Sequence, residues 1–148
     1  MASLVLFDAY ALIALFNDEP AASEVSHLMH SRDIASCTSA ANLAEVYDRL
    51  TRHRSRSRDE VASSVRLLLI AGMTVEPVDH EVAELAGELR AKHYDMRACA
   101  VSLADCAAAA TALTREASLA TSDPHLAGVC RDEGIDVIAL EDSNGKRP

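Results

Sequence analysis

Four acidic residues stand where their carboxyl groups could act together on a phosphate ester. Asp8, Glu45 and Asp105 each interrupt an apolar segment, where an unpaired charge is costly to bury. Asp123 follows the short apolar run of residues 118–121. Carboxylates that are brought together raise one another's pKa values, and a hard divalent cation such as Mg²⁺ or Mn²⁺ relieves that repulsion. Such a cation can activate water and stabilise the leaving oxygen in phosphodiester cleavage.

Each of these acids also has an ordinary local explanation. Asp8 and Asp123 are suited to cap the helices that we expect after them, and the residues around Asp105 match a capping box. Glu45 stands four residues before Arg49, the spacing of an ion pair along a helix. Taken singly, the local roles explain each position, but taken together the four acids favour a metal site.

The elements that must position these acids alternate between short apolar strands and helices. We expect strands at residues 3–7, 34–37, 74–78, 118–121 and 136–140, and helices at residues 9–16, 20–30, 40–54, 59–71, 80–93, 102–116 and 124–133. This alternation predicts an α/β fold, a central parallel sheet with helices on both faces. Ligands of such sheets bind beyond the carboxyl ends of the strands. Asp8 and Asp123 each follow a strand, so they share one crevice if their strands are neighbours.

The composition suits one folded domain. The chain has 148 residues, of which 49% are apolar, enough for one hydrophobic core. We expect a single domain over residues 1–141 and a frayed tail over residues 142–148. The four cysteines form no C-x-x-C pair, which is typical of reduced thiols in the cytosol. No apolar run approaches the about 20 residues of a membrane span, so we expect a soluble, cytoplasmic protein.

Charge and aromatic content limit how the chain can bind a polyanion. Its formal net charge is −9, whereas a simple nucleic-acid-binding module is expected to be basic, and only 3% of residues are aromatic. The basic residues are densest in one stretch, which we interpret as a phosphate-binding arm, with a solvated helix end and loop as the alternative. This stretch contains Arg49, Arg52, Arg54, Arg56 and Arg58.

The segments around the four acids resemble those of PIN domains, and within that family the VapC-like toxins of bacterial toxin–antitoxin pairs. The segments are Val5-Leu6-Phe7-Asp8-Ala9, Leu43-Ala44-Glu45-Val46, Leu103-Ala104-Asp105 and Ala120-Thr121-Ser122-Asp123-Pro124-His125-Leu126. The resemblance runs from about residue 4 to residue 140. It implies a single PIN-like domain with strand order 3-2-1-4-5.

The resemblance also implies an activity and its residues. It implies an endoribonuclease that depends on Mg²⁺ or Mn²⁺ and hydrolyses RNA phosphodiester bonds, a small antitoxin partner and a homodimer. Carried over by position, the four acids bind the metal and catalyse cleavage, and Thr121 takes the family's supporting polar position. The five arginines would then contact RNA. One position departs from the family pattern, because Tyr10 stands where a Ser or Thr is usual, two residues after Asp8.

Two other readings stay open. A haloacid-dehalogenase-like phosphatase is another acidic α/β phosphohydrolase, but it requires a second Asp at the position of Tyr10. A catalytically inactive PIN-like protein-interaction module would retain the fold without the chemistry, and the Tyr10 departure keeps that possibility in view. Binding of Mg²⁺ or Mn²⁺ discriminates between the active and the inactive protein.

Overall fold

The structure of the chain is a computed structural model that describes residues 1–53 and 56–148. Arg54, one of the five arginines of the predicted arm, lies outside the described residues. The five strands are β1 (Ser3–Phe7), β2 (Ile34–Ser39), β3 (Thr74–Glu76), β4 (Ser118–Thr121) and β5 (Val137–Ala139). The helices are α1 (Ala9–Phe16), α2 (Ala22–His30), α3 (Ala40–His53), α4 (Arg58–Ile70), α5 (His80–His93), α6 (Leu103–Arg115) and α7 (Pro124–Asp132).

The strands form one parallel sheet in the order β3-β2-β1-β4-β5. β1 is therefore central, and Leu6 pairs with Cys37 of β2 on one side and with Leu119 of β4 on the other. The order is the one that the PIN resemblance implies, so the predicted fold class is confirmed. Because β1 and β4 are neighbours, their carboxyl ends lie at the same edge of the sheet.

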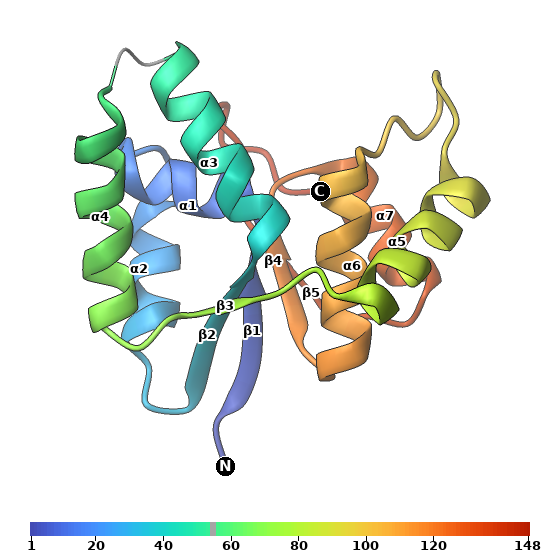
Figure 1. The fold of residues 1–148 in the computed structure, drawn as a ribbon, viewed down its shortest axis with the longest axis horizontal. Coiled ribbons are helices and arrows are strands. Elements are labelled where there is room, and N and C mark those ends of the chain that lie inside the picture. The colour runs from blue at the N-terminus through green and yellow to red at the C-terminus, as the bar shows by residue number, and fades with distance from the viewer. Residues whose placement is uncertain (54–55) are drawn as a thin grey trace.

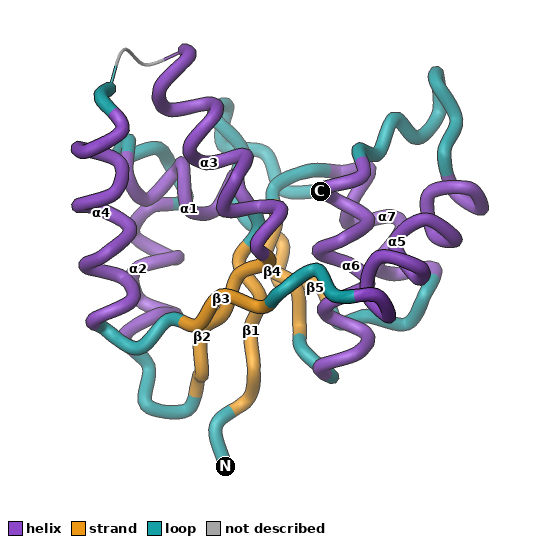
Figure 2. Tube along the Cα trace, in the orientation of Figure 1, coloured by secondary structure: helices purple, strands orange, loops and turns teal. Residues whose placement is uncertain are grey.

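The helices cover both faces of this sheet. Figure 1 shows α1, α2, α3 and α4 on one side of the strands and α5, α6 and α7 on the other, and Figure 2 shows the strands enclosed between the two groups. Leu6 and Leu119 belong to the core beneath α5, α6 and α7, whereas Val5, Phe7 and Ala120 belong to the core on the other side. Successive side chains along each strand point to opposite faces of the sheet, so apolar residues are needed on both faces where helices cover them.

Three predicted boundaries are wrong by two residues, and the others that differ are wrong by one. The second helix begins at Ala22, not at residue 20, because Asp18 has a left-handed φ of 52° and the Ala22 N–H closes a turn on the Glu19 carbonyl. β2 extends to residue 39, since the Thr38 hydroxyl donates to the Phe7 carbonyl at 2.8 Å and the strand continues alongside β3. β3 ends at residue 76, directly before a proline, which has no N–H for a sheet hydrogen bond.

The C-terminal segment makes contacts with the rest of the domain. Arg147 lies 2.9 Å from the Glu24 carboxylate and donates to the Ala139 carbonyl, and Arg131 donates to the carbonyl of Pro148. The predicted division between a domain and a tail at residue 141 stays a prediction. Across the part of the chain that the structure describes, every helix is too short or too polar to cross a membrane.

Candidate active site

The sheet brings two of the four predicted acids to one edge. Asp8 follows the last residue of β1, and its N–H donates to the Ala120 carbonyl of β4 at 3.3 Å. Asp123 lies two residues beyond the end of β4. Glu45 lies on α3 and Asp105 in the first turn of α6, and these two helices pack against each other.

Asp8 is the most deeply buried of the four, with 2% of its surface exposed. Its Oδ1 accepts the Ala11 N–H at 2.8 Å and so caps α1, whereas its Oδ2 is buried and has no hydrogen-bond partner among the described residues. Burial raises the pKa of Asp8 to about 7, and the charges of Asp105 and Asp123 push the pKa in the same direction against the lowering effect of the Thr121 hydroxyl. Asp8 therefore lies within electrostatic reach of two other acids.

Asp105 and Glu45 belong to the same electrostatic group. Burial raises the pKa of Asp105, and the Asp123 charge adds to this effect while hydrogen bonds from Ser102 oppose it. Burial also raises the pKa of Glu45, with Arg49 opposing and the charges of Asp105 and Asp123 adding. The charges of Asp105 and Asp123 therefore reach the other acids of the predicted quartet.

The local roles of the aspartates are present as well. Asp105 Oδ2 accepts the Ser102 N–H at 2.8 Å in a capping box, and Asp123 Oδ1 accepts the His125 N–H at 2.7 Å at the start of α7. One oxygen of each carboxyl accepts these bonds, so capping leaves the other oxygen for a second role. The Thr121 hydroxyl accepts the Asp123 N–H at 2.9 Å and lowers the pKa of Asp8, so this residue acts on both acids.

The carboxyl groups are not arranged as a complete set of metal ligands. Within residues 1–53 and 56–148, no three side chains of His, Cys, Asp or Glu lie together in a way that could hold a metal ion. Glu45 is engaged elsewhere, because its Oε1 lies 3.0 Å from Nε of Arg49. The donor chemistry nevertheless fits Mg²⁺ or Mn²⁺, which prefer oxygen ligands, and the buried Oδ2 of Asp8 lacks a partner that a cation would supply.

Arg49 lies at the edge of the acidic group, where it pairs with Glu45. Its guanidinium carbon is 4.6 Å from the centroid of the Tyr10 ring, so the residue that departs from the family pattern supports it. Both Arg49 and Tyr10 line a cleft of about 720 Å³, together with His53, Asp123 and His125. The spacing of Glu45 and Arg49 could have located Arg49 here, because it predicts the ion pair that forms.

The other described arginines of the predicted arm have separate surroundings. Arg52 is exposed and binds both carboxylate oxygens of Asp48, at 3.1 and 2.7 Å. Arg56 donates to the Phe16 carbonyl and to Asn17 Oδ1, both at 3.0 Å, so it holds the end of α1. Arg58 is exposed at the start of α4. These residues do not form one free basic surface, and RNA binding by the arm stays a prediction.

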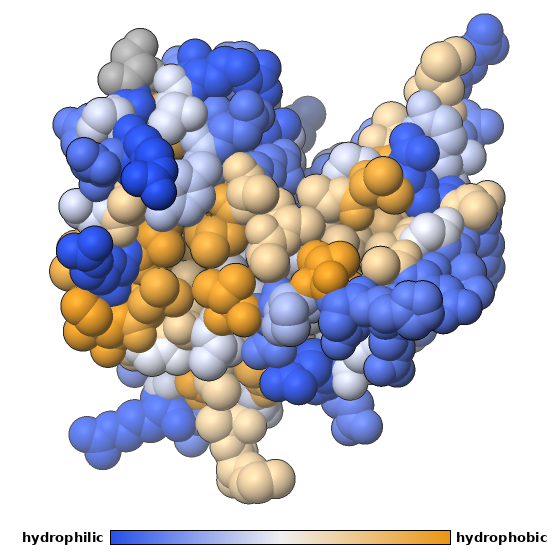
Figure 3. Space-filling model, in the orientation of Figure 1, coloured by the Kyte–Doolittle hydropathy of each residue, from blue (hydrophilic) through white to orange (hydrophobic). Residues whose placement is uncertain are grey.

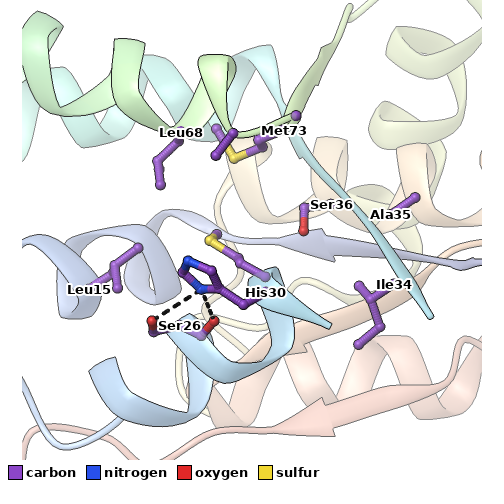
Figure 4. A pocket seen from close by; sticks show the side chains of 11 residues that line it. Leu15, Ser26, His30, Ile34, Ala35, Ser36, Leu68 and Met73 are labelled. Carbon is purple, nitrogen blue, oxygen red and sulfur yellow. Dashed lines mark hydrogen bonds between the residues drawn. The ribbon is translucent and has the colours of Figure 1, made fainter. Parts of the chain in front are cut away.

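A second cavity of about 460 Å³ lies between α2, β2 and α4 (Figure 4). Leu15, Ile34, Leu68 and Met73 contribute apolar side chains to it, and His30 is held at the rim through a hydrogen bond of its Nδ1 with the Ser26 carbonyl at 2.7 Å. No acidic residue lines this cavity. This cavity is therefore suited to an apolar group, and its lining residues provide no carboxylate that could bind a metal ion.

A doubly covered parallel sheet with acidic groups at its carboxyl edge places the protein among α/β proteins with an acidic site. The PIN domain family matches residues 5–132, and the chain belongs to this family. No curated protein matches the chain in sequence.

Solved structures share the fold at low sequence identity. The Mycobacterium tuberculosis toxin VapC20, described as cleaving the sarcin-ricin loop, is 18% identical with a TM-score of 0.68, covering 84% of this chain and 93% of that one. A chain of VapBC2 from Rickettsia felis, bound to a promoter DNA fragment, is 14% identical with a TM-score of 0.67, covering 91% and 97%. A chain of DNA-bound VapBC from Salmonella typhimurium is 21% identical with a TM-score of 0.65, covering 93% and 98%.

Proposed function

We propose that the protein is a metal-dependent endoribonuclease that hydrolyses RNA phosphodiester bonds and acts as the toxin of a toxin–antitoxin pair. The observation that carries this proposal is the placement of Asp8 and Asp123 at the carboxyl edge of the sheet, where one buried oxygen of Asp8 has no hydrogen-bond partner among the described residues. The charges of Asp105 and Asp123 also raise the pKa values of other acids of the quartet. Membership of the PIN family supports the proposal, as does the fold shared with a toxin described as cleaving the sarcin-ricin loop.

Asp8, Glu45, Asp105 and Asp123 would hold Mg²⁺ or Mn²⁺, as ligands contributed from β1, α3, α6 and the end of β4. When bound, the cation supplies activation of water and stabilisation of the leaving oxygen. The protein's own contribution is to fix these ligands. Three of the acids are anchored by backbone N–H groups at helix starts, and the Thr121 hydroxyl accepts the N–H of Asp123.

The test compares Asp8→Asn and Asp105→Asn with the wild type in RNA cleavage, with Mg²⁺, with Mn²⁺ and with a chelator. The matched control is Asp79→Asn, because Asp79 caps α5 with the same geometry, accepting the Val82 N–H at 2.9 Å, but lies outside the acidic group. We expect cleavage only with a cation and only in the wild type and the control. Full activity of purified Asp8→Asn would refute the assignment of the quartet.

An inactive PIN-like interaction module is the second candidate. The observation that favours it is the ion pair between Glu45 and Arg49, which occupies one of the four acids. An inactive module would show neither Mn²⁺ binding by calorimetry nor cation-dependent cleavage, whereas the nuclease shows both.

The proposed partner is a small antitoxin that places a basic side chain on the acidic group and apolar side chains on the exposed end of α4. The VapBC structures that share the fold support such a partner. Leu67 and Ile70 near the end of α4 are 68% and 76% exposed, and Figure 3 shows apolar surface over this part of α4. Apolar side chains favour contact with such a patch, and a basic side chain favours the acidic group.

We further propose that the protein forms a homodimer and acts in the cytoplasm.

The partner is tested by expressing the chain alone and together with the product of a neighbouring small reading frame. We expect growth arrest in the first case and rescue in the second, and we expect no growth arrest from Asp8→Asn expressed alone. If the chain alone is harmless while its purified form cleaves cellular RNA, the toxin assignment fails but the nuclease assignment remains.

A further inference from the structure

Two arginines of α3 make the same kind of ion pair in different surroundings. Arg49 pairs with Glu45 and Arg52 pairs with Asp48, each at the i,i+4 spacing. The side chains of Arg52 and Asp48 are 59% and 54% exposed, whereas those of Arg49 and Glu45 are 38% and 22% exposed. Solvent screens the first pair, while the second lies at the edge of the acidic group and is screened less.

The surroundings of Arg49 hold its guanidinium at the acidic group. The Tyr10 ring lies against one side of it, with 4.6 Å between the guanidinium carbon and the ring centroid, and Glu45 binds it at 3.0 Å. Arg49 also lowers the pKa of Asp105, so its charge reaches beyond its direct partner. A Ser or Thr at position 10 would provide no ring for this contact.

We propose that Arg49 is an internal counter-cation that holds Glu45 while the cleft is free of phosphate and competes with the divalent cation for that carboxylate. The inference rests on the proposed function in one respect, that the acidic group is the cation site. Tyr10 is the positioning residue, since its ring keeps the guanidinium beside Glu45. Among the described residues the acids do not form a complete set of metal ligands, and one of the four is paired with a cation from the chain itself.

The cleft beside Arg49 indicates what would release Glu45. Arg49, His53 and His125 give this cleft its basic lining, and its volume of about 720 Å³ leaves space for a phosphate group. Its acidic lining is formed by Glu19, Asp123, Glu141 and Asp142. A guanidinium binds phosphate through two parallel hydrogen bonds, so a phosphate in the cleft offers Arg49 a partner to replace Glu45. Glu45 is then free for the cation. Phosphate and cation therefore raise each other's affinity, and by linkage the effect is equal in both directions.

The first experiment measures Mn²⁺ binding by isothermal titration calorimetry to the wild type, Arg49→Gln and the matched control Arg52→Gln. We expect Arg49→Gln to bind Mn²⁺ about threefold to tenfold more tightly than the wild type, the range expected for loss of a modest competing ion pair. Arg52→Gln should bind as the wild type does, since Arg52 pairs with an acid outside the group. Equal affinities in wild type and Arg49→Gln would overturn the proposal.

Tyr10 is tested by Tyr10→Phe and Tyr10→Leu. The phenylalanine variant keeps the ring and should leave the Mn²⁺ affinity unchanged, whereas the leucine variant should tighten it in the same direction as Arg49→Gln. A merely structural role of Tyr10 would lower the melting temperature of the leucine variant without raising its Mn²⁺ affinity. If Arg49→Gln fails to fold, Arg49→Lys replaces it, since lysine keeps the charge but not the planar group that lies against Tyr10.

The second experiment repeats the Mn²⁺ titrations with saturating adenosine 5′-monophosphate, which has no phosphodiester to cleave, with a correction for Mn²⁺ bound by the nucleotide. The wild type should gain about fivefold or more in Mn²⁺ affinity, and Arg49→Gln should gain nothing. An equal gain in both proteins would overturn the coupling. If the wild type binds no Mn²⁺ at all, the proposed function fails as well, whereas Mn²⁺ binding that ignores Arg49 overturns this inference alone.

Discussion

The starts of α1 and α5 carry the same local motif in two different environments. Asp8 and Asp79 each cap a helix by accepting the backbone N–H three residues later, at 2.8 and 2.9 Å. Asp79 is exposed, whereas Asp8 is buried against β4, with a pKa of about 7 and an oxygen that has no partner among the described residues. A helix cap is therefore not what distinguishes a candidate catalytic acid. Burial beside other carboxyls distinguishes it.

The largest expected difference between Asp8 and Asp79 is the effect of their replacement by Asn on RNA cleavage. Asp8→Asn keeps the cap, because Asn caps helices as well as Asp does, but removes the charge that would hold the cation. We expect the cleavage rate to fall by at least about 100-fold, the scale on which a single transition-state contact acts. Asp79→Asn should stay within about twofold of the wild type, since only a helix cap is altered. Gel-based cleavage of a labelled RNA measures both, and equal losses would show that capping alone explains Asp8.

The second effect is on stability against pH in buffer without divalent cations. The folded pKa of Asp8, about 7, lies above its usual value of 3.8, so the folded state binds the proton more tightly than the unfolded state does. Stability of the wild type should therefore fall as pH rises from about 4 through 7, where the folded protein loses this proton. Asp8→Asn lacks this fall and should be the more stable protein at pH 8, by on the order of 1–4 kcal/mol.

Urea unfolding at pH 5 and pH 8 measures this difference. The advantage of Asp8→Asn over the wild type should grow between the two pH values, while Asp79→Asn should follow the wild type. An advantage that is the same at both pH values would mean that the ionisation of Asp8 is not its cause.

A smaller effect is expected for thermal stability in the presence of Mn²⁺. Mn²⁺ at about 100 times its dissociation constant should stabilise the wild type by about 2.7 kcal/mol, which raises the melting temperature by several degrees. Asp79→Asn should show the same rise, and Asp8→Asn should show little or none. Differential scanning fluorimetry with and without Mn²⁺ tests this, and a full rise in Asp8→Asn would place the cation elsewhere.

The smallest effect concerns the arginines beyond Arg49. Replacing Arg52, Arg54 and Arg56 by Gln should weaken RNA binding with little change in cleavage position, because phosphate contacts set affinity and not base choice. Each lost contact should flatten the log–log salt dependence of binding by roughly 0.7 for single strands.

Arg52 and Arg56 have different surroundings in the structure, so their single variants should differ in thermal stability. Arg56→Gln alone should lower the melting temperature, since Arg56 holds the end of α1, whereas Arg52→Gln should leave it unchanged. Binding measured against salt for the single and triple variants decides the matter. Identical slopes and affinities throughout would show that the arm does not contact RNA.

Much of the fold follows from local patterns in the sequence. The run from residue 3 to residue 7 is apolar enough to be buried on both faces, and the structure places β1 over these residues. Asp79 marks the start of α5 and Ser102 the start of α6, because each side chain accepts a backbone N–H that the helix leaves free. These features depend on interactions between residues three or four apart, so periodicity and capping chemistry were sufficient to predict them.

The four acids were predictable in part from the local sequence and in part only from the tertiary structure. Their residue types and order are local information, and the PIN resemblance predicted that they share a site. Their interaction depends on β4 lying beside β1 and on α6 packing against α3, which no local pattern specifies. Their chemistry as a cation site stays a prediction.

The spacing along the helix predicts the pair of Arg49 with Glu45, but the contact of Arg49 with Tyr10 was decided only by the tertiary structure. In the sequence Arg49 is the first of five arginines, and charge density alone assigns it to a surface arm. In the structure Arg56 supports α1, Arg52 pairs with an exposed acid, and Arg49 lies between Glu45 and Tyr10. The distinction arises because α1 and α3 pack side by side, which brings positions 10 and 49 together across a large separation in sequence. A charge pattern along the chain predicts pairs between residues four apart in one helix, but only the packing of the helices decides which residues of other elements screen, contact or bury each charge.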